Sequence, residues 1–249
     1  MSKLVGTPSD QVPAMLATGR TDVTALYVSL SARHPHGRDA DYLEWHALDH
    51  RPEQHRLASL RASFRLVSTP ACRAARAASD KRYDDADHMM NYLFADAAGL
   101  RHFNQLNLAM AEAGRTPYLL PLVERAVYRL DGLAAAPRIK VGADVLPWWP
   151  AKGVYVLIER GAASAASLAE VAGVGGAWWG GALPMQPPYT TTPNDGLQIT
   201  YCFLDDDPVA TAWRLRPILE LRWSASSIAP LFAGPFHTLT PYEWDRYLP

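Results

Sequence analysis

Apolar and polar residues alternate over short stretches in the first half of the chain, and this pattern predicts strands separated by helices. Residues 88–95 illustrate it, because their alternate positions form two sets, one of which contains His88, Met90 and Tyr92. Such stretches are rich in apolar, aromatic and β-branched residues, as strands are. Four strands are therefore expected at residues 24–31, 62–67, 88–95 and 125–130.

Two helices are expected between these strands. The first begins near Asp39 or Asp41. It is expected to break or kink at Arg51, because Pro52 disfavours helical geometry in the residue before it. The second covers residues 99–113, where apolar residues recur at helical spacing. The first half therefore has the order strand, helix, strand, strand, helix, strand.

The second half of the chain repeats this order of elements, although it does not repeat the residues. Strands are expected at 154–158, 177–182, 197–204 and 228–236, and helices at 162–172 and from Asp207-Pro208 to Pro217. Pro230 and Pro235 restrict the last strand to an edge of the sheet, because proline cannot donate a backbone hydrogen bond. Long loops are expected at 72–87 and 184–195.

This repeated order predicts the fold class and the division of the chain. Strand, helix, strand, strand, helix, strand is the split βαβ arrangement of a ferredoxin-like module. We therefore predict an α+β protein with two tandem ferredoxin-like βαββαβ modules. The predicted parts are an N-terminal arm at 1–22, a first module at 23–131, a linker at 132–150, and a second, degenerate module at 151–249.

Composition and charge exclude several classes of partner. The chain of 249 residues has 24 Lys and Arg against 25 Asp and Glu, so it offers no basic face for nucleic acid. No secretory leader is expected from its first residues, and it has no apolar run of about 18 residues that would span a membrane. Its two cysteines are far apart, which favours neither a disulfide framework nor a zinc site. A cytoplasmic protein with reduced thiols is expected.

Residues 45–53 read Trp-His-Ala-Leu-Asp-His-Arg-Pro-Glu and carry the most informative pattern in the sequence. His46 and His50 are four residues apart, so a helix places both rings on one face. Asp49 lies three residues after His46 and could orient its imidazole, and Glu53 could join the same face. Because imidazole titrates near neutral pH, the pair suits general acid/base chemistry.

This segment resembles the signature of the dimeric α+β barrel superfamily, especially its EthD-like branch. The residues that match directly are Trp45, His46, His50, Pro52 and Glu53, and Asp49 fits the acidic residue common before the second histidine. Gln54 stands where the branch often has arginine, which is a small departure. The resemblance covers residues 24–130 well and residues 150–240 weakly.

The resemblance implies a fold and a range of activities. Members usually dimerise so that two sheets face each other, and a tandem chain would form this α+β barrel within itself. Relatives include cofactor-free monooxygenases of aromatic polyketides, polyketide cyclases, dehydratases or decarboxylases, haem enzymes, and proteins of no known activity. Their cavities lie between the sheet and the helices of one module. Only the first module would keep a polar site, because the second has His237 as its sole histidine.

We therefore expect a small-molecule enzyme that acts on an apolar carbonyl or aromatic, polyketide-like compound. Cyclisation, dehydration, decarboxylation and cofactor-free oxygenation all suit such a site, as in lyases, cyclases and cofactor-independent monooxygenases. The expected catalytic residues are His50 as the main acid/base, His46 as its assistant, and Asp49 or Glu53 as tuning groups. The expected substrate-binding residues are Trp45, His88 and Tyr92.

Several alternatives stay open at the level of sequence. The histidine pair could be structural, and His88 with Tyr92 could be ordinary core residues. The chain could be a non-catalytic ligand-binding or structural member of the same fold, or a haem protein. No cofactor and no metal are expected, because two imidazoles lack the third protein ligand usual for zinc. The expected partner is a small apolar organic molecule, with neither nucleic acid nor membrane, and a homodimer is left open.

Overall fold

The computed structural model describes residues 22–185, 187–191 and 193–248, so nearly all of the predicted N-terminal arm lies outside it. The first half contains β1 (Ala25–Ser31), α2 (Asp39–Trp45), the π-helical turn η2 (His46–His50), α3 (Arg51–Gln54), β2 (Leu60–Val67), α4 (Pro70–Ala74), β3 (Ala78–Ser79), η3 (Lys81–Tyr83), β4 (His88–Phe94), α5 (Gly99–Glu112) and β5 (Leu122–Ala135). The second contains η4 (Ala143–Trp148), β6 (Gly153–Arg160), η5 (Ala166–Glu170), β7 (Val174–Ala182), β8 (Leu197–Leu204), α6 (Pro208–Ser224) and β9 (Ala229–Thr238).

The strands form one antiparallel sheet that closes on itself. Its order is β2-β4-β1-β5-β7-β8-β6-β9-β3. An additional pairing between β2 and β9 closes the sheet into a barrel. Within each half the four long strands lie in the order second, third, first, fourth, as in a ferredoxin-like sheet. The halves meet where β5 pairs with β7 and where β9 pairs with β2. The predicted α+β barrel is thus confirmed as the fold class.

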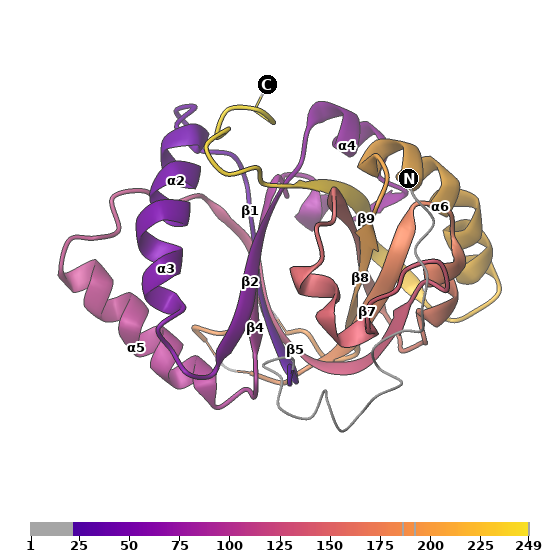
Figure 1. Cartoon of the computed structure of the whole chain (residues 1–249), viewed down its shortest axis with the longest axis horizontal. Helices are drawn as coiled ribbons and strands as arrows, with labels where there is room; N and C mark the ends of the chain where they lie inside the picture. The colour runs from indigo at the N-terminus through magenta and orange to yellow at the C-terminus, as the bar shows by residue number, and fades with distance from the viewer. Residues whose placement is uncertain (1–21, 186, 192, 249) are drawn as a thin grey trace.

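Helices cover the outside of the barrel (Figure 1). α2, α3 and α5 lie over the sheet of the first half, and α6 with α4 lies over that of the second. The sequence produces these layers because alternate residues of a strand point to opposite faces. On β1, Leu26, Val28 and Leu30 belong to the barrel core, whereas Ala25 and Tyr27 pack toward α5. The strand face that carries Tyr27 is the floor of the site described below.

Two segments predicted as a loop and a linker contain more structure than the sequence predicts. The predicted loop 72–87 includes η3, with Tyr83 buried in the barrel core, and the short strand β3, which pairs with β9. β5 continues to Ala135 and so includes the start of the predicted linker, because those residues pair with β7. The same linker holds η4, and Trp178 donates a hydrogen bond from Nε1 to the carbonyl of Ala143 there at 2.6 Å.

β9 corrects the expectation of an edge strand. It pairs with β6 along one side and with β3 and then β2 along the other. The β3 pairing uses Phe232 and Ala233, and the β2 pairing uses His237 and Thr238. Pro235 lies between these two short pairings, so its missing N–H interrupts neither of them.

Two predicted helices of the second half also differ from the structure. The helix expected at 162–172 is reduced to the 3₁₀ turn η5. α6 does not end at Pro217 but continues to Ser224. Leu215 and Leu219, on either side of that proline, are fully buried, and their burial offsets the roughly 3 kcal/mol that a proline costs inside a helix.

The start of α6 yields a test of the local structure. Asp207 is the N-cap of this helix, and its carboxylate accepts a hydrogen bond from the backbone N–H of Ala210 at 2.8 Å. Asp207→Ala is expected to lower the free energy of unfolding by about 1 kcal/mol, because it leaves that N–H without its cap. Urea unfolding measures the change. Asp207→Asn, which can still cap, is the control and should stay close to wild type; equal losses in both variants would contradict the capping role.

Within the described part of the chain, no helix combines the length and the apolar character that crossing a membrane requires.

Candidate functional site

A cavity of about 320 Å³ lies between the outer face of the first half's sheet and the elements that cover it. Its floor comes from β1, β2 and β4, and includes Tyr27, Ser29, Arg65 and Tyr92. The walls come from the helical segment 39–54, from α5, and from the segment that leads into β5. Small-molecule sites have volumes of roughly 300–1,000 Å³, so the cavity suits a compact ligand.

The turn η2 places both predicted histidines in this cavity. Arg51 donates its backbone N–H to the carbonyl of His46, five residues earlier, which defines the π turn. Pro52 then occupies the first turn of α3, where its lack of an N–H costs little. The helical segment therefore continues to Gln54 and does not end at Arg51. π turns of this kind often occur at functional sites.

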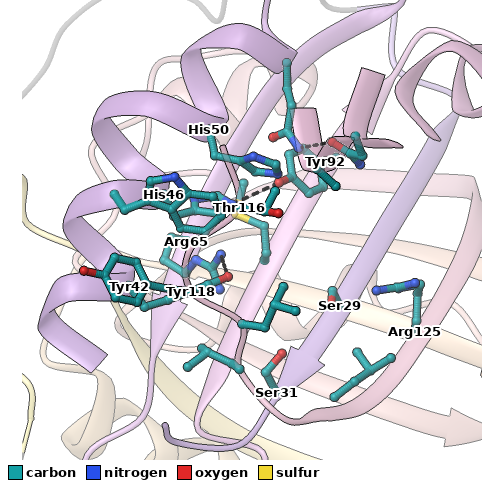
Figure 2. A pocket seen from close by; sticks show the side chains of 18 of the residues that line it. Ser29, Ser31, Tyr42, His46, His50, Arg65, Tyr92, Thr116, Tyr118 and Arg125 are labelled. Atoms are coloured by element: carbon teal, nitrogen blue, oxygen red, sulfur yellow. Dashed lines mark hydrogen bonds between the residues drawn. The ribbon is translucent and has the colours of Figure 1, made fainter. Parts of the chain in front are cut away.

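His46 and His50 lie on one face of the helical segment, with ring centroids 5.4 Å apart, and both line the cavity. Figure 2 shows both rings directed toward Tyr92 on β4. His46 Nε2 and the Tyr92 hydroxyl are 3.1 Å apart and share a hydrogen bond. Burial lowers the pKa of His46 well below its usual value, and the positive charge of Arg65 lowers it further. Burial also raises the pKa of Tyr92, so both groups are neutral at pH 7.

His50 is the more available of the two imidazoles. Its Nδ1 is buried without a hydrogen-bond partner, and its ring lies 4.9 Å from that of Trp45 between centroids. Burial lowers the pKa of His50 to about 4; Asp49 opposes this shift, and Arg65 and Arg115 add to it. At neutral pH His50 is therefore a neutral imidazole that can accept a proton.

Asp49 and Glu53 lie outside the cavity. Both carboxylates form ion pairs with the Arg115 guanidinium, which follows α5. Arg115 also fixes Trp45, because its backbone carbonyl accepts a hydrogen bond from the indole Nε1 at 3.2 Å. Asp49 thus bonds Arg115 and not His46, contrary to the predicted orienting contact. Asp49 raises the pKa of His50 through its charge, and neither acid lines the cavity.

His88 shares a strand face with Tyr92, as predicted, but it lies beyond the cavity wall. Its side chain is completely buried, and its Nε2 is 2.7 Å from the Asp39 carboxylate at the start of α2. Burial lowers the pKa of His88 despite this acid. Burial alone would raise the pKa of Asp39, but the hydrogen bonds from His88 and from the N–H of His34 bring it below its usual value. A neutral His88 therefore donates to an ionised Asp39.

Arg65 is the cavity residue that the sequence analysis misses. It lies on β2 with only 4% of its surface exposed, and its Nη2 donates to the Tyr42 hydroxyl at 2.8 Å. A charged residue in the apolar stretch 60–67 is the signal that could have drawn attention to it. Other cavity residues that carry polar groups were likewise absent from the predicted site; these are Tyr27, Ser29, Ser31, Tyr42, Gln54, Asn107, Thr116, Tyr118 and Arg125.

The ligand set does not suit a metal ion. Across the described ranges, no group of three or more His, Cys, Asp and Glu side chains is placed to hold one. Within the cavity, the buried guanidinium of Arg65 opposes a further cation beside His46 and His50. Cys72 and Cys202 are buried free thiols far from the histidine pair in the fold.

Comparisons with known proteins now add to this geometry. No protein-family model and no curated protein sequence matches the chain. Among solved structures, it is similar to an anthrone oxidase-like protein, with a TM-score of 0.52 and 10% identity over 88% of this chain and 92% of that one. It is also similar to a protein proposed to be a chlorite dismutase, with a TM-score of 0.50 and 9% identity over 91% and 100%. A third similar structure is that of a protein proposed to be a monooxygenase, from Fusobacterium nucleatum subsp. nucleatum. Its TM-score is 0.49, with 9% identity over 88% of this chain and 93% of that one.

The chain has the dimeric α+β barrel fold. At 10% and 9% identity these likenesses establish the fold alone, because one fold hosts many reactions. The EthD-like branch and the tandem origin of the two halves stay predictions. The dimeric α+β barrel of this chain is closed by the β5–β7 and β9–β2 pairings of a single polypeptide.

The lowered pKa of His50 predicts a loss of stability in acid. In the unfolded chain a histidine titrates near 6.5, whereas in the folded chain His50 titrates near 4. Between these values the unfolded chain binds a proton that the folded chain does not, so stability falls as pH drops from about 6.5 to about 4. The titration of His50 alone should lower the free energy of unfolding by about 2–3 kcal/mol at pH 4.5, and by almost nothing above pH 7.

Urea unfolding at several pH values measures this loss. His50→Gln should show a shallower fall than wild type between pH 7 and 4.5, since glutamine does not titrate. Identical pH profiles for the two proteins would contradict the assigned environment of His50.

Proposed function

We propose that the chain is an enzyme that removes a proton from a carbon next to a carbonyl group, or conjugated with one through an aromatic ring, in a small, largely aromatic or polyketide-like compound. The observation that carries this proposal is His50, a neutral imidazole that lines the cavity and whose buried Nδ1 has no hydrogen-bond partner among the described residues. His46 and Tyr92, hydrogen-bonded to each other, supply a second neutral donor–acceptor pair beside it.

The proposed first step is a proton transfer to His50. The electron pair of the broken C–H bond moves to the carbonyl oxygen, which gives an enolate and an imidazolium. The hydroxyl of Tyr92, kept neutral by its raised pKa, is a donor that can stabilise the enolate oxygen. The same enolate adds to a second carbonyl of the substrate in cyclisation, expels a β-hydroxyl group as water in dehydration, or reacts with O₂ directly, with the substrate as the reductant. Decarboxylation of a β-keto acid gives an enolate of this kind by loss of CO₂ in place of the proton.

The environment of His50 favours acidic carbon compounds. An imidazole with a pKa of about 4 is a weak base, so it removes protons well only from carbons whose enolate is strongly stabilised. Enolates that become aromatic meet this condition. The positive charge of Arg65 lowers the pKa of His50. The negative charge of a bound enolate would offset this effect and so stabilise the imidazolium that forms.

Deuterium exchange with anthrone tests the proposal. Its CH₂ group lies opposite the carbonyl, and its enol is fully aromatic. We expect the protein to accelerate exchange of this CH₂ in D₂O above the buffer rate, as followed by proton NMR. Oxygen consumption in the same sample distinguishes oxygenation, in which O₂ converts the CH₂ to a carbonyl with release of water, from proton transfer alone.

The other outcomes favour the alternatives. Anthrone that binds without faster exchange supports a non-catalytic ligand-binding protein. A Soret band in the purified protein supports the haem alternative.

A further inference from the structure

Arg65 is a buried cation in the cavity for which the described residues provide no carboxylate. Its one hydrogen-bond acceptor is the neutral hydroxyl of Tyr42, and the guanidinium also lies 5.1 Å from the centre of that ring. Its Nε is buried and has no partner. Burial of an ion costs several kcal/mol unless an opposite charge and hydrogen bonds compensate for it.

Among the described residues, three of the four other buried charged side chains have an ion-pair partner, and the fourth, Asp39, accepts two hydrogen bonds. Asp87 forms ion pairs with Arg33, Arg73 and Arg76. Glu159 is paired with Arg222. Arg65 is therefore an exception within the described chain, and the cavity is the side from which a counter-charge can reach it.

The acids nearest to the cavity are already engaged. Asp39 accepts a hydrogen bond from His88, and Asp49 and Glu53 are paired with Arg115 on the outer surface. The remaining cationic residue of the wall, Arg125, donates to the carbonyl of Pro188 at 3.1 Å. In Figure 2, Arg65 lies below His46, whereas Arg125 lies at the other end of the cavity, beyond Ser29.

We propose that the ligand of this cavity carries an anionic oxygen, either a carboxylate or an ionised phenol or enol, that binds the guanidinium of Arg65. The inference rests on the proposed function, since it assigns a substrate class to the same cavity. The aromatic residues Tyr27, Tyr92 and Phe103 pack against one another beside this polar end, so the rest of the ligand is expected to be an aromatic body.

Calorimetric titration of three probes of one shape tests this inference. 2-Naphthoate is ionised at pH 7, 2-naphthamide is its neutral counterpart, and 2-naphthol can lose a proton on binding. Wild type should bind 2-naphthoate at least about 10-fold more tightly than 2-naphthamide, because hydrogen bonds to a charged group are the stronger ones. Arg65→Gln should weaken 2-naphthoate binding about 10- to 100-fold and change 2-naphthamide binding little.

Two further arginine variants serve as controls. Arg101→Gln removes a charge from the exposed face of α5 and should bind all three probes as wild type does. Arg125→Gln removes the other cation of the wall and should weaken 2-naphthoate binding less than Arg65→Gln does. The naphthol arm separates the two kinds of anion: binding with release of a proton to the buffer assigns a phenolate, and tight binding of 2-naphthoate alone assigns a carboxylate.

The inference is overturned if wild type neither prefers 2-naphthoate to 2-naphthamide nor binds 2-naphthol with release of a proton, or if Arg125→Gln carries the larger effect. Arg65→Lys guards against a folding defect in Arg65→Gln, because it keeps the charge and should keep part of the preference. His50→Gln separates this inference from the proposed function. It should still prefer 2-naphthoate while it fails to exchange anthrone, so each idea can fail without the other.

Discussion

Replacement of His50 by glutamine is expected to slow the exchange of anthrone CH₂ protons by about 10²–10⁴-fold, the usual effect of losing a general base. Glutamine has a similar length but no nitrogen that can accept a proton at neutral pH. The fold should stay intact, because His50 has no hydrogen-bond partner among the described residues and faces the cavity. Initial exchange rates at pH 7 and thermal unfolding, measured on the same samples, check both statements.

The pH profile identifies the base more specifically. With a pKa of about 4, His50 is unprotonated from neutral pH down to mildly acidic conditions, so the wild-type rate should stay flat there and fall only as pH approaches 4. His55→Gln is a matched control, because His55 lies near the end of the same helical segment but bonds Ser63 outside the cavity. A His50→Gln protein that exchanges anthrone at the wild-type rate would rule out this role.

Local sequence patterns predicted most strands because each strand carries its own signal. β8 was predictable at its observed bounds, since residues 197–204 are a compact apolar run between turn residues. The far end of β5 carries no such signal, and only its pairing with β7 makes it a strand. The position of Pro235 between two separate pairings likewise depends on where β2 and β3 meet β9, which a local pattern does not contain.

The candidate site divides in the same way. The spacing of His46 and His50 is local, so the shared face of the two rings was predictable even though the turn that carries them is π-helical. The ion-pair partner of Asp49 was not predictable from a local pattern, because Arg115 comes from a loop far along the chain. Arg65 was missed for a similar reason: its burial follows from the packing of a helix over β2, as its bond to Tyr42 shows.

His88 illustrates how a strand face and a cavity can differ. The alternation of residues 88–94 correctly places His88 and Tyr92 on the side of the helices. The start of α2 covers one end of that face, and Asp39 there takes up the His88 imidazole. Only the other end, with Met90 and Tyr92, opens into the cavity.

His88→Ala is therefore expected to lower the free energy of unfolding by about 3 kcal/mol, because it removes a neutral hydrogen-bond donor from a buried carboxylate. The variant leaves the buried, ionised Asp39 with the N–H of His34 as its remaining partner. Urea unfolding of the variant beside wild type measures the loss. Asp39→Asn should partly restore stability in the His88→Ala background, because it removes the uncompensated charge.

Ligand binding separates this structural role from a role in the cavity. In the folded protein, His88→Ala should bind 2-naphthamide with nearly wild-type affinity, since His88 does not line the cavity. His102→Ala, on the exposed side of α5, controls for the loss of an imidazole and should change neither stability nor binding. If His88→Ala kept the wild-type stability but no longer bound 2-naphthamide, the structural role would be contradicted and His88 would be assigned to ligand binding. Loss of stability with retained binding places its function in holding α2 against β4, and hence in holding the helical segment that carries His46 and His50 over the sheet.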